Sequence, residues 1–221
     1  TNMDRYEYIY RASLVSNKNK TDLLDYLIKL SPVIEDDLLL LIHRDLLFIN
    51  IENNTYNNKF NEYQVLFDKS DTFTSNDIYA FALCIKYNSD NKNILEALKL
   101  CDVIDKKIVL CKDENLKFES VIIYYWYANL YFSLKDKTNA VKYANLTLEL
   151  IDNSNGRKMS MIDEAGLKSI SAQLNQIKLS SSITSPIIVS KKYGRNDRVK
   201  VKYNNGDVIE KKYKQVEADI L

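Results

Sequence analysis

Few side chains in this chain have the types and spacing that catalysis requires. The 221 residues contain one histidine, His43, and three cysteines. A Ser–His–acid arrangement would have to use His43, which lies among leucines at helical spacing and is expected to be a partly buried structural residue. Since no CxxC pair accompanies the histidine, the sequence predicts no metal site, no catalytic residue and no cofactor.

The acidic run Glu35–Asp37 and the three cysteines have structural interpretations. Acidic side chains at the start of a helix interact favourably with its dipole, and this explains the run better than a pair of catalytic acids does. Cys84, Cys101 and Cys111 fall on apolar helix faces and are expected in the core. An odd number of cysteines with no paired framework favours a reducing compartment, so we expect a cytoplasmic protein.

The composition is that of a globular, helical protein. Hydrophobic residues make up 46% and charged residues 28% of the chain, which excludes a disordered protein. Only four glycines and two prolines are present, and so few breakers favour long helices. The net charge of +1 gives no overall attraction to nucleic acid or membrane, and no apolar run approaches the roughly 18 residues of a membrane span. The abundance of Asn, Lys, Ile and Tyr is typical of AT-rich bacterial genomes.

The most informative stretch is 121–151, which predicts two helices folded against each other. Residues 118–134 are apolar on two faces, so this helix must be covered on both sides. One face carries Phe118, Val121, Ile122, Tyr125, Ala128 and Phe132, and the other carries Ile123, Tyr127, Leu130 and Leu134. After a short polar turn at 135–137, the second helix has Ala140, Ala144, Leu148 and Ile151 on one stripe.

The order of small and aromatic residues in this stretch resembles a tetratricopeptide repeat. The matching residues are Tyr124, Ala128, Tyr131, Ala140 and Thr147–Leu150. Tyr127 replaces the usual Leu, Thr147 replaces the usual Ala, and the closing Pro is absent. The resemblance implies a scaffold of stacked helical hairpins that binds other proteins. The alternative is an unrelated helical hairpin in a bundle.

Further amphipathic patterns predict helices before and after this pair, at 4–16, 21–30, 36–52, 57–68, 75–87, 93–111 and 160–178. Leu14 is expected in the core stripe of the first helix, Thr21–Asp22 is expected to cap the second, and Thr74–Asp77 to cap the fifth. The helix at 160–178, with Ile162 and Ala165 on its apolar stripe, is expected to shield the end of the stack.

The expected fold is therefore mainly α, with antiparallel helical hairpins stacked as a tetratricopeptide-like solenoid or bundle over residues 3–178. The segment Ala97–Leu100 resembles the one at Ala140, but at an offset of 43 residues instead of the family's 34, which indicates degenerate repeats with longer helices.

A Ser-rich linker at 179–185 and a small basic β module at 186–221 are expected to follow. Alternation of Val199, Val201 and Tyr203 with basic residues, and the turn signal Asn205-Gly206, predict a β hairpin. Two strands alone are marginal in water, so the hairpin must pair with 186–190, dock on the helices or be completed by a partner. The module has nine Lys and Arg against five Asp and Glu, which leaves the helical part at −3.

The segment Gly194–Asp197 resembles the opening of the C-terminal zinc-binding segment of the preprotein translocase ATPase. That family continues with cysteines, and this chain has none after Cys111, so the metal site cannot be carried over. The resemblance implies a docking tail without its metal. In physical terms, Gly194 allows an unusual backbone angle, and Asn196 or Asp197 can close a turn before the strand.

These patterns favour a non-catalytic scaffold or adaptor that binds a protein or peptide through a helical groove and the hairpin. Tyr124 and Tyr131 are expected to pack between helices, whereas Trp126 and Tyr127 are candidate contact residues. The alternative function is nucleic-acid binding through 191–214. The other interpretation of these basic residues is a solvent-exposed strand face whose lysines discourage edge-to-edge aggregation. The candidate contact residues of the module are Lys191, Lys192, Arg195, Arg198, Lys200 and Lys202.

Overall fold

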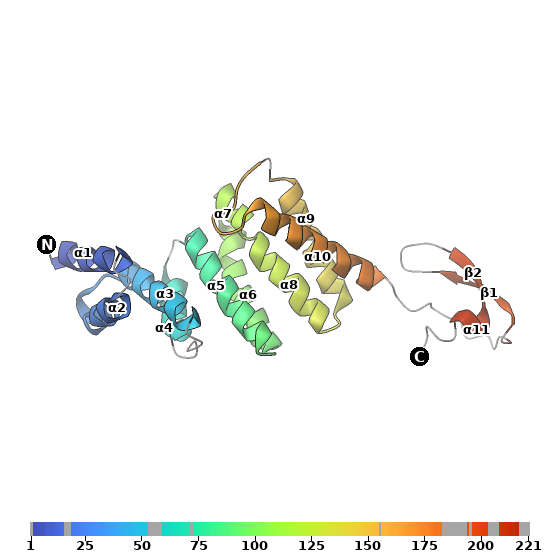
Figure 1. Cartoon of the computed structure of the whole chain (residues 1–221), viewed down its shortest axis with the longest axis horizontal. Coiled ribbons are helices and arrows are strands. Elements are labelled where there is room, and N and C mark those ends of the chain that lie inside the picture. The colour runs from blue at the N-terminus through green and yellow to red at the C-terminus, as the bar shows by residue number, and fades with distance from the viewer. Residues whose placement is uncertain are drawn as a thin grey trace.

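The computed structural model describes residues 2–15, 19–52, 59–70, 73–154, 156–182, 194, 196–202 and 208–216. Over this part of the chain the protein is mainly α, with helices packed in consecutive pairs and a small antiparallel hairpin near the C-terminus, as the sequence predicts. Figure 1 shows the helices following one another as an extended array, with the hairpin beyond α10.

The helical array is built from α1 (Asn2–Val15), α2 (Lys20–Lys29), a 3₁₀ turn (Ser31–Val33), α3 (Asp36–Glu52), α4 (Lys59–Lys69), α5 (Ser75–Asp90), α6 (Ile94–Leu110), α7 (Glu114–Glu119), α8 (Val121–Ser133), α9 (Lys137–Asp152) and α10 (Glu164–Ser182). Consecutive helices pair as α1/α2, α3/α4, α5/α6 and α8/α9, and α10 packs on both α8 and α9.

Helix α8 lies at the centre of the packing, as its apolar sequence predicts. It contacts α5 and α6 on one side and α9 and α10 on the other, and Figure 1 shows α5, α8 and α10 side by side. Leu130 and Ala128 are fully buried. Phe132 and Leu134, both expected inside, are exposed because they lie in and just after the last turn of α8.

The single helix expected at 118–134 is two helices, α7 and α8, separated by Ser120. The Ser120 hydroxyl donates to the carbonyl oxygen of Lys117 at 2.5 Å, which ends α7. Serine competes in this way with the helical backbone pattern. Phe118 therefore belongs to α7, where it packs with Val121 and Met159.

Three expectations about the first two helices and the cysteines are wrong. Leu14 is exposed, because only Tyr10, Tyr6 and Ile9 of α1 reach the cluster formed with α2 and α3. The N-cap of α2 is Asn19, so Thr21 and Asp22 lie inside the first turn. Cys84 and Cys101 are buried as expected, but Cys111 is only half-buried because it caps the C-terminal end of α6.

A buried polar network joins α1, α3, α4 and α5. Arg44 Nη1 lies 3.3 Å from Asp77 Oδ1, which also accepts a hydrogen bond from the Tyr63 hydroxyl at 2.8 Å. The Tyr10 hydroxyl donates to Asp45 at 3.1 Å. Asp77 Oδ2 accepts from the Thr74 backbone N–H at 2.8 Å, which confirms the predicted cap of α5. Buried charges are tolerated only when they are paired in this way.

Other core predictions hold for α4 and the histidine. Phe60, Tyr63 and Phe67 are buried along the inner face of α4, as their spacing predicts. His43 is buried on α3, with Nδ1 3.4 Å from a carboxylate oxygen of Glu62 on α4, which confirms its structural position.

Helix α10 begins and ends about four residues later than expected. Asp163 accepts a hydrogen bond from the Gly166 N–H at 2.8 Å, so the helix begins at Glu164 and leaves Ile162 in the preceding loop. Ala165, expected on the buried stripe, is exposed. The first four residues of the expected linker, 179–182, continue the helix because neither Gly nor Pro interrupts them.

The hairpin pairs β1 (Arg198–Lys202) with β2 (Val208–Lys212) in antiparallel register, with Val199 opposite Lys211. A short helix, α11 (Tyr213–Val216), which the sequence did not predict, places Val216 against Val199 and Val201. The predicted strand at 186–190, Tyr203 and the turn at Asn205-Gly206 lie outside the described residues.

Asp197 closes the turn before β1, and it is one of the two residues that the sequence predicts for this role. Its carboxylate accepts from the Gly194 N–H at 2.7 Å, and its own N–H donates to the Gly194 carbonyl at 2.9 Å. Gly194 does not have a positive φ, so the unusual backbone angle expected there is not used. None of the helices in the described ranges has the length and apolar character to cross a membrane.

The central position of α8 predicts unequal costs for two leucine truncations. Leu130→Ala removes a fully buried side chain and should lower the free energy of unfolding by about 2–5 kcal/mol. Leu110 is the last residue of α6 and its side chain is 80% exposed, so Leu110→Ala should change the free energy of unfolding by less than about 0.5 kcal/mol. Urea denaturation of the two variants measures the difference, and equal effects would contradict the packing described.

Candidate functional site

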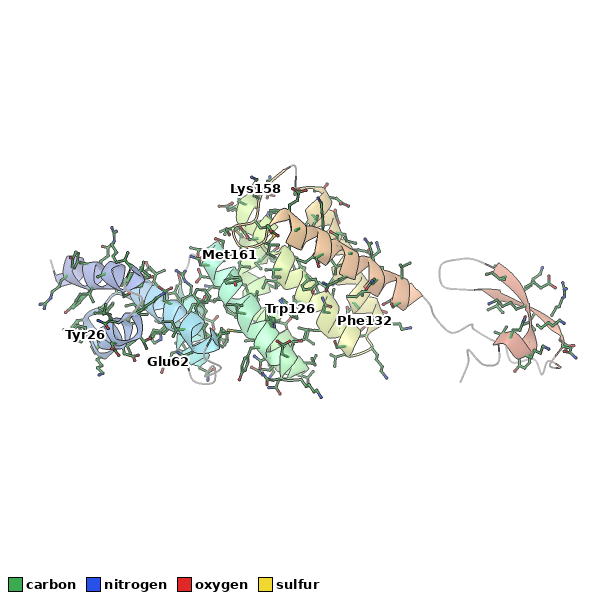
Figure 2. All side chains as sticks on the ribbon, in the orientation of Figure 1. Tyr26, Glu62, Trp126, Phe132, Lys158 and Met161 are labelled. Carbon is green, nitrogen blue, oxygen red and sulfur yellow. The ribbon has the colours of Figure 1, made fainter. Side chains whose placement is uncertain are left out.

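The first helices of two consecutive pairs, α5 and α8, pack side by side and share an apolar surface. Tyr79 of α5 and Ile122 of α8 line a hollow of about 50 Å³ between these helices. Trp126 follows Ile122 by one helical turn and so lies on the same face of α8. We call the set of Tyr79, Ile122, Trp126 and Met161 the α5/α8 surface; Figure 2 labels Trp126 and Met161 along it.

The loop between α9 and α10 closes one end of this surface. Met159 is buried against Phe118 and Val121. Ser160 is held by Glu119, whose carboxylate accepts from the Ser160 N–H at 2.6 Å and from its hydroxyl at 2.5 Å. These contacts leave Met161 45% exposed beside the hollow.

A larger cavity of about 860 Å³ shares lining residues of the same loop with the hollow. Met159, Met161 and Ile162 line both spaces. The remaining walls include the apolar side chain of Leu167 and several charged side chains, which are Arg157, Lys158, Asp163, Glu164 and Lys168. The α5/α8 surface therefore leads from a half-exposed tryptophan to a cavity with an apolar lining and a charged rim.

Trp126 and Tyr127, the two predicted contact residues of the helical part, lie in different environments because neighbouring helical residues point about 100° apart. Trp126 is half-buried, with its ring edge-on to Tyr125 at 5.5 Å between centroids. Tyr127 is 1% exposed and packs between α6, α8 and α9. Only Trp126 therefore offers surface to a partner.

Tyr127 belongs to a stack of tyrosines over two aspartates of α6. Its ring lies 4.3 Å from that of Tyr143, and the Tyr131 ring is parallel to Tyr143 within 4°. The hydroxyls of Tyr127 and Tyr124 donate to Asp102 at 2.6 Å and Asp105 at 2.8 Å, respectively. The packing roles predicted for Tyr124 and Tyr131 agree with this arrangement.

Burial and the neighbouring carboxylates keep these tyrosines protonated. Burial, and then the hydrogen bond to Asp102, raises the pKa of Tyr127 well above its ordinary range. Burial raises the pKa of Tyr143 to about 12. Burial also raises the pKa of Asp105, against the opposing effect of the hydrogen bond from Tyr124. The tyrosines of the stack are therefore protonated hydrogen-bond donors at neutral pH.

The predicted contact residues of the C-terminal module are only partly described. Arg198 and Lys200 are exposed on β1, and Lys202 ends that strand. Lys191, Lys192 and Arg195 lie outside the described residues. Across the described ranges, no group of three or more His, Cys, Asp or Glu side chains is arranged to hold a metal ion.

Sequence reasoning missed Tyr79, Ile122 and Met161 as parts of one surface. The spacing of Ile122 and Trp126 in the sequence is a detectable signal, because residues four apart share a helical face. The position of Met161 has no such signal, since it depends on the contact between Glu119 and Ser160, which are 41 residues apart.

Comparison with known proteins gives no match to a family model, to a curated protein or to a solved structure. The resemblances to a tetratricopeptide repeat and to the translocase segment therefore stand on the residues of this chain alone.

The raised pKa of Asp105 predicts a pH dependence of stability. The pKa of Asp105 is higher in the folded state than in the unfolded state, where it is near 3.8, so the folded state holds this proton more tightly. The free energy of unfolding therefore falls as the pH rises from about 4 through the folded-state pKa of Asp105. Asp105→Asn keeps an acceptor for Tyr124 and removes this loss. The free energy of unfolding of the variant relative to wild type should therefore rise between pH 4 and 7, and a constant difference would contradict the assignment.

Proposed function

We propose that this protein is a non-catalytic, tetratricopeptide-like scaffold that binds an extended peptide or protein segment across the α5/α8 surface, in the cytoplasm. The observation that carries the proposal is the half-exposed Trp126, one turn after Ile122, which itself lines the hollow together with Tyr79 of the neighbouring pair. The apolar hollow and the adjoining cavity extend this surface, so a bound segment has places for two side chains.

The position of the surface within the pairs supports a binding role. In tetratricopeptide-like scaffolds the first helices of successive pairs form the concave binding face. Here α5 and α8 are the first helices of the pairs α5/α6 and α8/α9, and they pack against each other. Large aromatic side chains in partly covered positions are typical of binding hot spots. Trp126 has both the residue type and the position that such an interface uses.

The partner chemistry follows from the lining of the surface. Tyr79, Ile122, Trp126 and Met161 favour apolar or aromatic anchors, while the charged side chains around the cavity favour polar flanks. Methionine side chains adapt to ligands of different shapes, so Met161 favours a peptide over a rigid small molecule. The C-terminal hairpin is the second docking element of the proposed scaffold.

The binding proposal is testable through tryptophan fluorescence, because Trp126 is the only tryptophan of the chain. Peptides selected from a random 12-residue display library should shift the Trp126 emission and saturate with a micromolar Kd. Trp126→Ala should weaken binding of these peptides at least tenfold, since removing an aromatic hot spot typically costs about 2 kcal/mol or more. Fluorescence anisotropy of labelled peptide measures the affinity of both proteins.

Phe132→Ala is the matched control for this experiment. Phe132 is an aromatic residue in the last turn of the same helix, 38% exposed and outside the set of residues that defines the α5/α8 surface. Its truncation should leave the peptide affinity within twofold of wild type. Selection of no peptide, or peptides that bind Trp126→Ala as tightly as wild type, would reject the α5/α8 surface as the binding site.

A further inference from the structure

The two faces of the C-terminal hairpin differ in chemistry. The register of β1 and β2 places Val199 and Val201 with their cross-strand neighbours Lys211 and Ile209 on one face. That face is covered by α11, where Val216 is fully buried against the two valines. The opposite face has no covering element among the described residues, and its side chains are exposed wherever they are described.

The open face is strongly basic. Strand alternation assigns to it Arg198, Lys200, Val208, Glu210 and Lys212 among the residues whose side chains are described. Three cations therefore share this face with one carboxylate. Glu210 lies 3.9 Å from Arg198 Nη1, and both side chains are largely exposed. An exposed pair at this distance neutralises little of the charge.

Several lysines of the helical array have a different arrangement. Lys86, Lys99 and Lys168 each form an ion pair three or four residues away on the same helix, with Asp90, Glu96 and Glu164 respectively. These lysines balance local acidic residues. The concentration of unbalanced positive charge on one hairpin face is therefore a local feature of the module and does not reflect the composition of the chain.

We infer that this open face binds the phosphate backbone of duplex DNA without reading its sequence. Alternate residues on a strand are about 6.7 Å apart, and one DNA strand carries a phosphate about every 3.4 Å of helix axis, so Arg198 and Lys200 are spaced to contact phosphates of the same DNA strand.

The composition of the face selects duplex over single-stranded nucleic acid. Proteins that bind single strands stack bases on exposed aromatic side chains. The described residues of the open face contain no aromatic residue, and Tyr213 lies half-buried on the covered side. Exposed Arg and Lys side chains contact phosphate oxygens whatever the bases are, which is why we assign them backbone binding without sequence readout.

The test is the salt dependence of binding to a fluorescein-labelled 20-base-pair DNA duplex, measured by anisotropy with the full chain. Three phosphate contacts, from Arg198, Lys200 and Lys212, predict a slope of log K against log salt of about −2.7. Lys200→Gln with Lys212→Gln should reduce the slope by about 1.8 and weaken binding at 50 mM salt, because each lost phosphate contact contributes about 0.9 to the slope. A 20-nucleotide single strand should bind more weakly than the duplex.

Lys211→Gln is the matched control, since it removes one charge from the same hairpin on the covered face. It should leave the slope unchanged. The inference is overturned if the duplex does not bind at 25 mM salt, if the Lys200/Lys212 variant keeps the wild-type slope, or if polyglutamate displaces the duplex as well as unlabelled DNA does at equal charge. The inference is independent of the α5/α8 surface, so Trp126→Ala should bind DNA as wild type does.

Discussion

The packing of this protein depends on one helix that has no polar side. Different sides of α8 are fully buried, one with Ile123 and Leu130 and another with Ala128. Exposing one of these sides to water would lose the stabilisation from burying its apolar side chains, about 1.5–3 kcal/mol for a residue of leucine size. The neighbours α5, α6, α9 and α10 satisfy this requirement from different directions. This packing leaves Ile122 and Trp126 half-buried, and they belong to the α5/α8 surface for which we propose peptide binding.

A second constraint determines how the N-terminal helices join this centre. Arg44 and Asp77 are both nearly inaccessible to water, and each needs the other because an unpaired buried charge is strongly destabilising. Their pairing connects α3 to α5, and Tyr63 brings α4 to the same carboxylate. This placement of α3, α4 and α5 satisfies all three groups, and moving one helix would leave a buried polar group unpaired.

The parts of the structure that the sequence predicts are those set by local periodicity. The apolar faces of α8, the inner stripe of α4 and the alternation at Val199 and Val201 all follow from residues a few positions apart. The failures come from contacts distant in sequence and from single local hydrogen bonds. Tyr127 has the residue type of a contact residue. Its interior position involves a hydrogen bond to Asp102 on another helix, which the local sequence pattern does not reveal. The break at Ser120 and the late start of α10 depend on single side-chain hydrogen bonds, which periodicity does not detect.

The helical packing requires α8 to be enclosed by its neighbours, and amide hydrogen exchange measures this enclosure most directly. Enclosure predicts that the α8 amides between Ile123 and Leu130 exchange only when the whole array opens, with protection equal to the global free energy of unfolding. The amides of α1, at the outer end of the array, should exchange far faster. Exchange of α8 at the rate of α1 would show that its apolar faces are not enclosed and would contradict the account.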